Sequence, residues 1–317
     1  APAAGTGAGA KAGTADELLA DERIVVELGR GLLGLLAPTA AGNTPGSLPE
    51  RSTAIRSAVA GDLGLVVPSI AMRDDLSLPD RGYRVTIAGD VVAAAEIPAG
   101  RMLAVPPAGE RLDDLDGQPT QAGFGGADDA APVDPLTGRR GAWVGHAQAE
   151  TVRRRGAAVY GDADCISRAV EAAVRRHGDR LLSRDAVARL VESLRVAQPA
   201  VVEQVGAGPL TIARIQRTLQ CLLRDGLPIR PLAELLEVMS DHAAAADDPA
   251  QLAEIVRRSF ARAICRRARD PRGRLVVVRL EGPAIDAVVN ASGRPPAQLV
   301  AELRRALRPV VERGARP

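Results

Sequence analysis

The residue pattern most suggestive of chemistry is a glycine-rich motif near the N-terminus. Gly29, Gly31 and Gly34 follow the apolar run IVVEL in GxGxxG spacing, and Glu50 lies about 20 residues further on, where dinucleotide sites place a ribose-binding acid. The helix that this motif would open is broken by Pro38 after little more than one turn, and Glu50 stands at a helix start. We therefore expect a glycine-rich turn with leucines in the core, and keep a dinucleotide-dependent enzyme as the alternative function.

Other catalytic and metal-binding patterns are weaker. The sequence has no GxxxxGK[ST] phosphate loop and no GxSxG nucleophile elbow. His146, His177 and His242 lack metal-ligand spacing to one another or to the cysteines, so surface or capping roles are expected. Cys165 and His177 share a predicted helix, but their spacing separates them by about 18 Å along its axis, which excludes a catalytic pair within that helix. We expect no catalytic residue, no metal and no cofactor.

An acidic cluster could suggest a divalent-ion loop. It consists of Asp113, Asp114, Asp116, Asp128 and Asp129. These residues lack the alternate spacing and the closing glutamate of an EF-hand, so a solvated acidic loop is the better interpretation. Its charge would favour a basic partner surface.

Length and composition narrow the class of protein. A chain of 317 residues predicts two to four domains. Only 2% of residues are aromatic, which argues against a stacking platform for bases, and 41 basic against 39 acidic residues leave a net charge of +2. We therefore expect no nucleic-acid partner. No apolar run is long enough to cross a bilayer.

The cysteines and the N-terminal run indicate a cytoplasmic protein. Cys165, Cys221 and Cys265 are far apart in helical apolar patterns, as expected for buried, reduced thiols. Residues 1–20 are rich in Ala, Gly and Thr without the layout of a signal peptide, and predict a flexible linker from an upstream segment.

Residues 21–99 have an α/β pattern, with a helix near 50–61. The turn Ala88-Gly89-Asp90 has hairpin chemistry, because glycine accepts the positive φ of tight turns. We expect one sheet built from the strands 24–28, 65–72, 83–88 and 91–97.

The next segment, 100–161, changes character. Short strands MLAVPP and AWVG bracket a stretch rich in Asp, Gly and Pro, which cannot form a packed core alone. We expect a long surface loop inside a small inserted α+β domain. A loop on a rigid scaffold is a typical binding surface.

The remainder is predominantly helical. Helices are expected to begin at Ser183, Thr211, Pro231 and Asp248-Pro249, each a favourable start signal. A strand at 274–280 with helices near 284–289 and 297–311 suggests a last α/β domain truncated before its final strand. The predicted fold is α/β plus α and multidomain: linker 1–20, α/β domain 21–99 with 162–181, inserted domain 100–161, all-α domain 182–267 and incomplete α/β domain 268–317.

Several segments together resemble the FlhA/SctV family, the export-gate proteins of flagellar and type III secretion systems. The most specific are RDDLSLPDRGYRV, VDPLTGRRGAWV and LLRDGLPIRPLAELLE, and the match runs in family order from about Asp21 to the C-terminus. The MRDDL segment and the VDP-x-x-G loop favour the flagellar branch.

The resemblance implies a docking platform and not an enzyme. It implies a cytosolic region on the cytoplasmic face of the inner membrane, attached to the membrane by an N-terminal transmembrane region that is absent from this sequence. It also implies a homo-nonameric ring that docks export chaperone–substrate complexes and the stalk protein of the ATPase complex. A diverged paralogue that has lost chaperone docking is a further alternative.

The resemblance places the chaperone site in a cleft lined by the inserted domain. Thr137 stands where the family pattern has Phe, and Arg168 where a small Thr is typical, so docking is expected to be weakened or re-specified. Asp134 would still offer a carboxylate to a partner's cation or amide, although Asp-Pro is also ordinary turn chemistry. The candidate partner-binding residues are Asp134, Pro135, Thr137, Gly138, Trp143 and Arg168.

Overall fold

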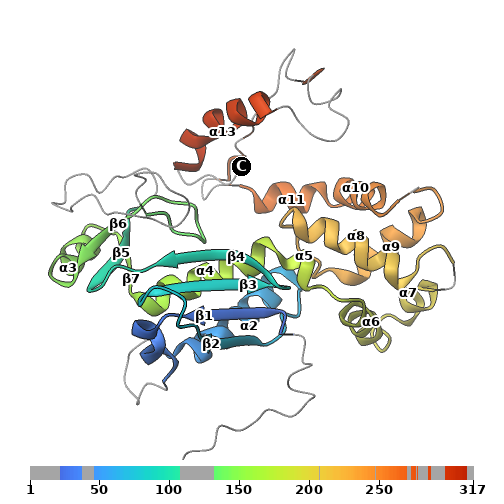
Figure 1. Ribbon diagram of the computed structural model, residues 1–317. Coiled ribbons are helices and arrows are strands. Elements are labelled where there is room, and N and C mark those ends of the chain that lie inside the picture. Colours follow the sequence, from blue (N-terminus) through green and yellow to red (C-terminus); the bar gives the residue numbers. More distant parts are fainter. Residues whose placement is uncertain are drawn as a thin grey trace, which may run out of the picture.

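A computed structural model describes most of the chain (Figure 1). The described residues are 22–37, 46–107, 132–206, 208–246, 248–269, 273–275, 277, 285–286 and 297–312. Within these ranges the first half contains two small sheets with helices against them, and the second half is helical.

The first sheet has four strands in the order β2-β1-β3-β4. Strand β1 pairs in parallel with β2 and antiparallel with β3, which continues antiparallel into β4. The prediction of one sheet is confirmed, but the strand expected at 65–72 begins only at Ile70, because Pro68 has no N–H for a ladder. The strands are β1 (Ile24–Leu28), β2 (Ile70–Asp74), β3 (Gly82–Ile87) and β4 (Asp90–Glu96).

The hairpin between β3 and β4 has the predicted geometry. Ala88 and Gly89 have φ values of 50° and 84°, the left-handed pair that a two-residue hairpin turn uses. Ala88 is the only residue other than glycine with positive φ in the described part of the chain.

Two helices support this sheet. Helix α2 (Leu48–Leu63) packs on α4 (Asp162–Arg176), which in turn contacts β3 and β4. A short 3-10 helix, η1 (Arg30–Leu36), follows β1 where the glycine motif lies. Alternate residues of β1 are completely buried, so its pleat directs one row of side chains into the core.

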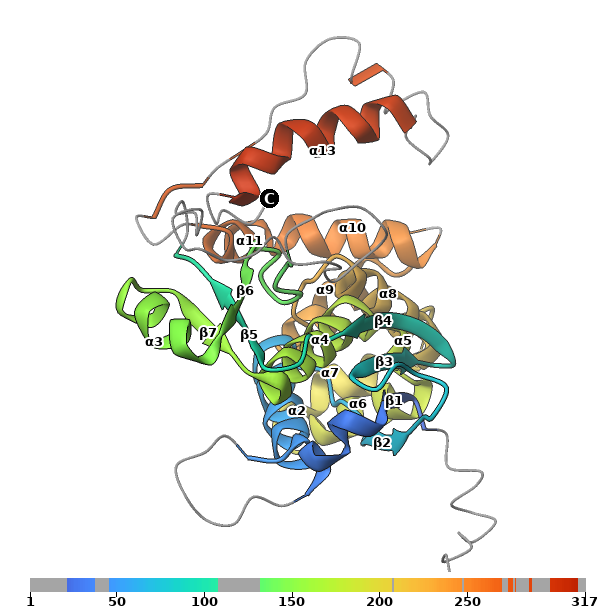
Figure 2. The same ribbon diagram turned by 60° about the vertical axis from the view of Figure 1, so that its left-hand side comes forward.

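The second sheet has three antiparallel strands in the order β6-β5-β7 (Figure 2). They are β5 (Arg101–Val105), β6 (Ala142–Gly145) and β7 (Ala158–Tyr160), with α3 (His146–Arg154) between the last two. The strand β7 was not predicted, because three residues are too few to show an alternating pattern. Only Gly161 separates it from α4, so the second sheet is attached directly to that helix.

The helical part confirms the predicted caps. The side chains of Ser183, Thr211 and Asp248 each accept a hydrogen bond from the backbone N–H three residues later, at the starts of α6, α8 and α10. Helix α9 begins just after Pro231, as expected. The helices are α5 (Gly178–Leu181), α6 (Arg184–Ser193), α7 (Pro199–Gln204), α8 (Ile212–Arg224), α9 (Leu232–His242), α10 (Pro249–Ser259), α11 (Ala261–Arg267) and α13 (Ala297–Glu312).

Helix α13 confirms the helical stretch predicted at 297–311. The strand expected at 274–280 and the helix expected at 284–289 lie largely outside the described residues, as do the linker 1–20 and the acidic cluster between Asp113 and Asp129.

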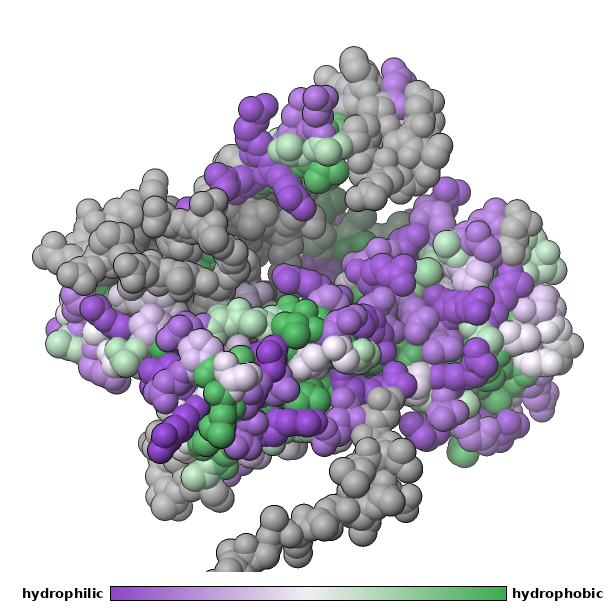
Figure 3. Space-filling model, in the orientation of Figure 1, coloured by the Kyte–Doolittle hydropathy of each residue, from purple (hydrophilic) through white to green (hydrophobic). Residues whose placement is uncertain are grey.

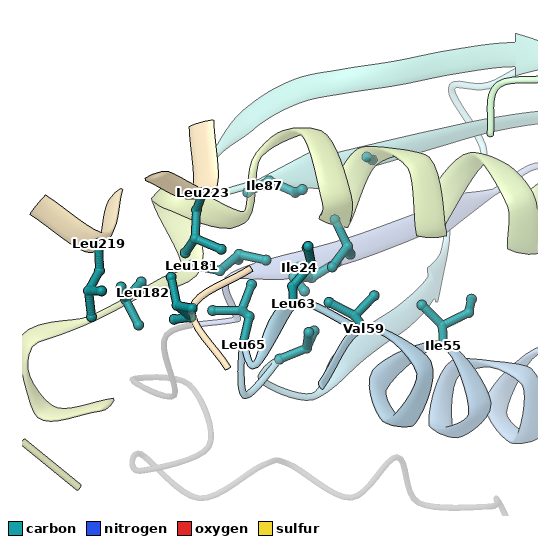
Figure 4. Packing of buried hydrophobic residues seen from close by; sticks show 14 of the residues in the cluster. Ile24, Ile55, Val59, Leu63, Leu65, Ile87, Leu181, Leu182, Leu219 and Leu223 are labelled. Atoms are coloured by element: carbon teal, nitrogen blue, oxygen red, sulfur yellow. The ribbon is translucent and has the colours of Figure 1, made fainter. Parts of the chain in front are cut away.

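The helical part and the first sheet share one core. Leu219 and Leu223 of α8 point toward Leu181 and Leu182, and Leu65 lies beside them (Figure 4). Around this apolar contact, the side-chain amides of Gln216 and Gln220 both donate to the carbonyl of Leu182, at 2.9 and 3.1 Å. The burial of these leucines and the two hydrogen bonds to the carbonyl of Leu182 hold the helical part against the first sheet and its helices.

A second link joins α2 to the segment before α9. The N–H of Ile229 donates to the carbonyl of Leu63 at 2.7 Å, and Gly64 ends α2 with a φ of 75°. A Cβ at Gly64 would lie 2.6 Å from the backbone nitrogen of Arg230. The chain can therefore make this link only with glycine at that position.

Gly64→Ala is expected to lower the free energy of unfolding by about 1–3 kcal/mol. Alanine is strained in the left-handed backbone conformation, and its Cβ would clash with the backbone of Arg230. Denaturant unfolding followed by circular dichroism measures the change. The matched control is Gly61→Ala, on the exposed side of α2, where a Cβ meets nothing within 4 Å. That control should raise stability by about 0.5–1 kcal/mol, and equal effects of the two substitutions would contradict the argument.

The surface of the described residues is mainly hydrophilic on the face drawn in Figure 3, with small, scattered apolar areas. In the part of the chain that the structure describes, we find no helix whose length and apolar character would allow it to span a membrane.

Candidate functional site

The glycine motif serves packing within the chain. The N–H groups of Gly29 and Gly31 donate to the carbonyls of Gly82 and Asp80, at 2.8 and 2.7 Å. A Cβ on Gly29 would lie 2.1 Å from the carbonyl oxygen of Pro79, and one on Gly31 would lie 2.5 Å from a carboxylate oxygen of Asp80. These two amides, which a phosphate would need, are already bonded. The motif therefore does not fit a dinucleotide site.

Glu50 also has a local role. Its carboxylate accepts a hydrogen bond from the N–H of Ser47 at 3.1 Å, and the Ser47 side chain completes a capping box at the start of α2. Glu50, which would bind a ribose in a dinucleotide-dependent enzyme, thus caps helix α2.

The loop 132–140 is a closed turn. The N–H of Asp134 donates to the carbonyl of Arg139, and the N–H of Gly138 donates back to the carbonyl of Asp134, both at 2.8 Å. Val133 and Arg140 form an isolated antiparallel bridge at its base. Gly138 has a φ of 71°, which favours glycine. The local sequence VDPLTGRR therefore forms a compact projection before β6.

The carboxylate of Asp134 is completely buried beneath this loop. Arg168 of α4 binds it with both arms of its guanidinium: Nε donates to Oδ1 at 2.7 Å and Nη2 donates to Oδ2 at 2.5 Å. The hydroxyl of Thr137 donates to Oδ2, and the N–H of Leu136 donates to Oδ1 at 3.3 Å. A bidentate arginine is the strongest cationic partner available to a carboxylate.

An aromatic ring completes the cluster. The guanidinium of Arg168 lies over the ring of Tyr160, 4.1 Å from its centroid, and only 19% of its side chain is exposed. Burial alone would raise the pKa of Asp134, but the hydrogen bonds from Arg168 and Thr137 outweigh it and leave the pKa below its usual value. The pair is therefore charged at neutral pH.

Helix α4 is itself held in place at its first turn. Arg81 binds Asp162 at 2.6 Å and Arg51 binds Asp164 at 2.7 Å. Both acids also lie in the positive field of the helix N-terminus. These contacts set the position of the helix that carries Arg168.

The structure divides the candidate site residues into an outer and an inner group. Thr137 and Gly138 are exposed at the loop tip and Pro135 is half-buried. Trp143 is 1% exposed and belongs to the core. Arg168 and Thr137 bind the carboxylate of Asp134 from within the chain, so it is not free in this structure, and the partner-binding role of Asp134 stays a prediction.

Two features of the cluster were missed from the sequence. Tyr160 lies on the unpredicted β7. The pair Arg139-Arg140 was not among the candidate residues, although its position directly after the turn places it on the loop. Its spacing from Asp134 was the available signal.

The cysteines differ more than expected. Cys165 is buried, and burial with nearby Asp164 and Asp162 raises the pKa of its thiol to about 12, so it is not a nucleophile. Cys221 is only half-buried, and Cys265 is exposed because α11 buries none of its residues, which corrects the prediction of buried thiols at these two positions. Among the described residues no three His, Cys, Asp or Glu side chains converge as a metal site would require.

Comparison with known proteins gives a family and a fold. The FHIPEP family model matches residues 3–310. The flagellar biosynthesis protein FlhA of Bacillus subtilis is 29% identical over 274 residues, which are 86% of this chain and 38% of that protein. The chain thus spans well under half the length of this relative.

Two solved structures share the fold. The Chlamydia pneumoniae CdsV, in a complex with CdsO, superposes with a TM-score of 0.70 at 18% identity, over 91% of this chain and 83% of that one. The nonameric SctV-C of EPEC superposes with a TM-score of 0.64 at 14% identity, over 90% and 83%. The mixed fold with two small sheets is therefore that of these two solved structures, and the chain belongs to the FHIPEP family of flagellar and type III secretion proteins.

Proposed function

We propose that this chain is the cytosolic docking platform of a flagellar or type III export gate, where it binds chaperone–substrate complexes and components of the export apparatus. The observation that carries the proposal is the loop 132–140, which is fixed at its base by Arg168 and exposed at its tip. A rigid base with an exposed tip loses little conformational entropy when a partner binds.

The comparisons support the coarser parts of this proposal. CdsV, which has the same fold, forms a complex with CdsO, and this supports a protein partner from the export apparatus, such as the stalk protein of the ATPase complex. SctV-C is nonameric, which supports a ring of nine copies for this chain. The location we propose is the cytoplasmic face of the membrane, with the membrane-spanning region outside this sequence.

We also propose the four-part division of the chain. The four-stranded sheet with α2 and α4 would form the first domain, the three-stranded sheet with α3 the inserted one, and α6 to α11 the helical one. The C-terminal α/β domain stays a prediction.

A diverged paralogue without chaperone docking is the second candidate. It is favoured by the closure of the Asp134 carboxylate, since Thr137 and Arg168 occupy the group that a partner would contact. A dinucleotide-dependent enzyme has no comparable support, because the amides of its motif are bonded within the chain.

The test is a calorimetric titration with a flagellar export chaperone bound to its substrate, both from the same genome. The full chain is expected to bind with saturation, and Leu136→Glu is expected to weaken the affinity at least about tenfold, because it places a charge beside the exposed tip. The matched control is Val196→Glu, at a 95% exposed apolar residue of the helical part, which should bind as the unaltered chain does.

Thermal unfolding of each variant checks that the chain is folded. Absence of binding by the folded, unaltered chain would favour the diverged paralogue. Equal loss in both variants would exclude the loop as the contact.

A further inference from the structure

We infer that the partner bound at the loop 132–140 presents an anionic surface, such as a segment rich in Asp and Glu. This inference rests on the proposed docking function, and names the chemistry of the partner at that same site. It follows from the state of the Asp134 carboxylate and from the charges that remain on the loop.

The Asp134 carboxylate has no capacity left for a partner. An ionised carboxylate offers about four acceptor positions. Oδ1 accepts from Nε of Arg168 and from the N–H of Leu136, and Oδ2 accepts from Nη2 of Arg168 and from the hydroxyl of Thr137. A cation or amide from a partner would first have to break one of these bonds.

Arg168 is also difficult to displace. Its guanidinium is held on one side by the carboxylate and on its face by Tyr160. The acid it neutralises is completely buried, so removing Arg168 would leave a charge without compensation in the interior. An incoming cation would in addition meet the charge of Arg168 itself.

The charge that remains on the loop is positive. No Asp or Glu occurs from residue 135 to residue 149, whereas Arg139 and Arg140 follow the turn directly. Arg140 is exposed, and within the described residues neither arginine forms an ion pair. With Asp134 neutralised by Arg168, the described part of the loop carries two positive charges, Arg140 on its exposed side and Arg139 partly buried beside it, that no described acid pairs with.

Arg139 adds an unsatisfied donor. Its Nη2 is buried with no hydrogen-bond partner among the described residues, an unfavourable state for a charged group. Arg139 also lies near the ring of Tyr160. Its charge, like that of Arg168, opposes the rise that burial causes in the pKa of Tyr160. Carboxylates from a partner would satisfy such donors, and arginine binds them bidentately.

The test measures binding of the chaperone–substrate complex from the same genome to the full chain at low and high salt. Arg140→Glu is expected to weaken the affinity about tenfold and to reduce its dependence on salt, because charge reversal on an exposed rim opposes an anionic partner. The matched control is Arg189→Glu, an exposed arginine of α6 that makes no ion pair with other described residues, and its affinity should change less than about twofold.

A second measurement distinguishes the sign of the partner directly. An oligo-glutamate peptide should compete with the complex for the unaltered chain, whereas an oligo-lysine peptide of equal length should not. Binding that is unchanged or tightened by Arg140→Glu, or competition only by oligo-lysine, would overturn the inference and leave the docking function standing. Failure of the folded chain to bind the complex at either salt concentration would remove the docking function and the inference together.

Discussion

Arg168→Ala is expected to lower the free energy of unfolding by about 3 kcal/mol. Removing the guanidinium leaves the Asp134 carboxylate buried without a cation, and a buried charge that loses its partner is more costly than the pair itself. It also removes the contact with the ring of Tyr160. Equilibrium unfolding in denaturant at neutral pH measures the loss.

The control for this prediction replaces both partners. Asp134→Asn combined with Arg168→Met removes the charge and keeps a side chain of similar length, so most of the lost stability should return. A cost of Arg168→Ala below about 1 kcal/mol would show that the pair contributes little, as exposed ion pairs do.

The pH dependence of the same pair has a definite sign. Because the folded protein holds the pKa of Asp134 below its usual value, the unfolded chain binds the proton more readily. The stabilisation is therefore complete above the unfolded pKa, about 3.9, and is lost as the pH falls through the folded value. The difference between the unaltered chain and Arg168→Ala should shrink as the solution is acidified below about pH 4.

Trp143→Ala is expected to cost about 3–5 kcal/mol of unfolding free energy. The side chain is 1% exposed on β6, opposite Leu103 of β5, and belongs to the main core cluster. Truncating so large a buried side chain loses its burial and leaves a cavity. Denaturant unfolding gives the magnitude, and the chain has no other tryptophan, so the signal should be circular dichroism.

Trp143→Phe is the matched variant, since it keeps an aromatic ring and should cost appreciably less. This pair of variants separates two roles of the residue. Unchanged stability with lost partner binding would restore Trp143 as a contact residue, whereas lost stability identifies it as the support beneath the loop.

The two departures from the family pattern belong together. Thr137 and Arg168 are 31 positions apart (168 − 137), yet both donate to the same oxygen of Asp134. Considered one at a time, the first removes an aromatic anchor and the second adds a charge. Considered together, both bind the carboxylate of Asp134 from within the chain, and under the proposed docking function the arginines beside it are the charged groups that a partner would meet.

What the sequence by itself determined was mostly local. Side-chain caps such as Ser183, Thr211 and Asp248 bind a backbone N–H three residues away, so their effect is readable from neighbouring letters. Hydrophobic periodicity likewise predicted the strands of the first sheet, apart from the start of β2, and the helices α6, α8, α9, α10 and α13, whereas the short helix α7 was not predicted. The loop at Asp134 was also predicted as a turn, because Asp-Pro and glycine are typical of turns.

Only the tertiary structure decided which of these local elements contact one another. The spacing of Gly29 and Gly31 suggested a cofactor, but their close approach to the turn at Pro79 depends on how β1 pairs with β3. The sequence likewise placed Asp134 and Arg168 in one candidate site without showing that they bind each other. Contacts between residues distant in the chain depend on the packing of whole sheets and helices, which local preferences do not specify.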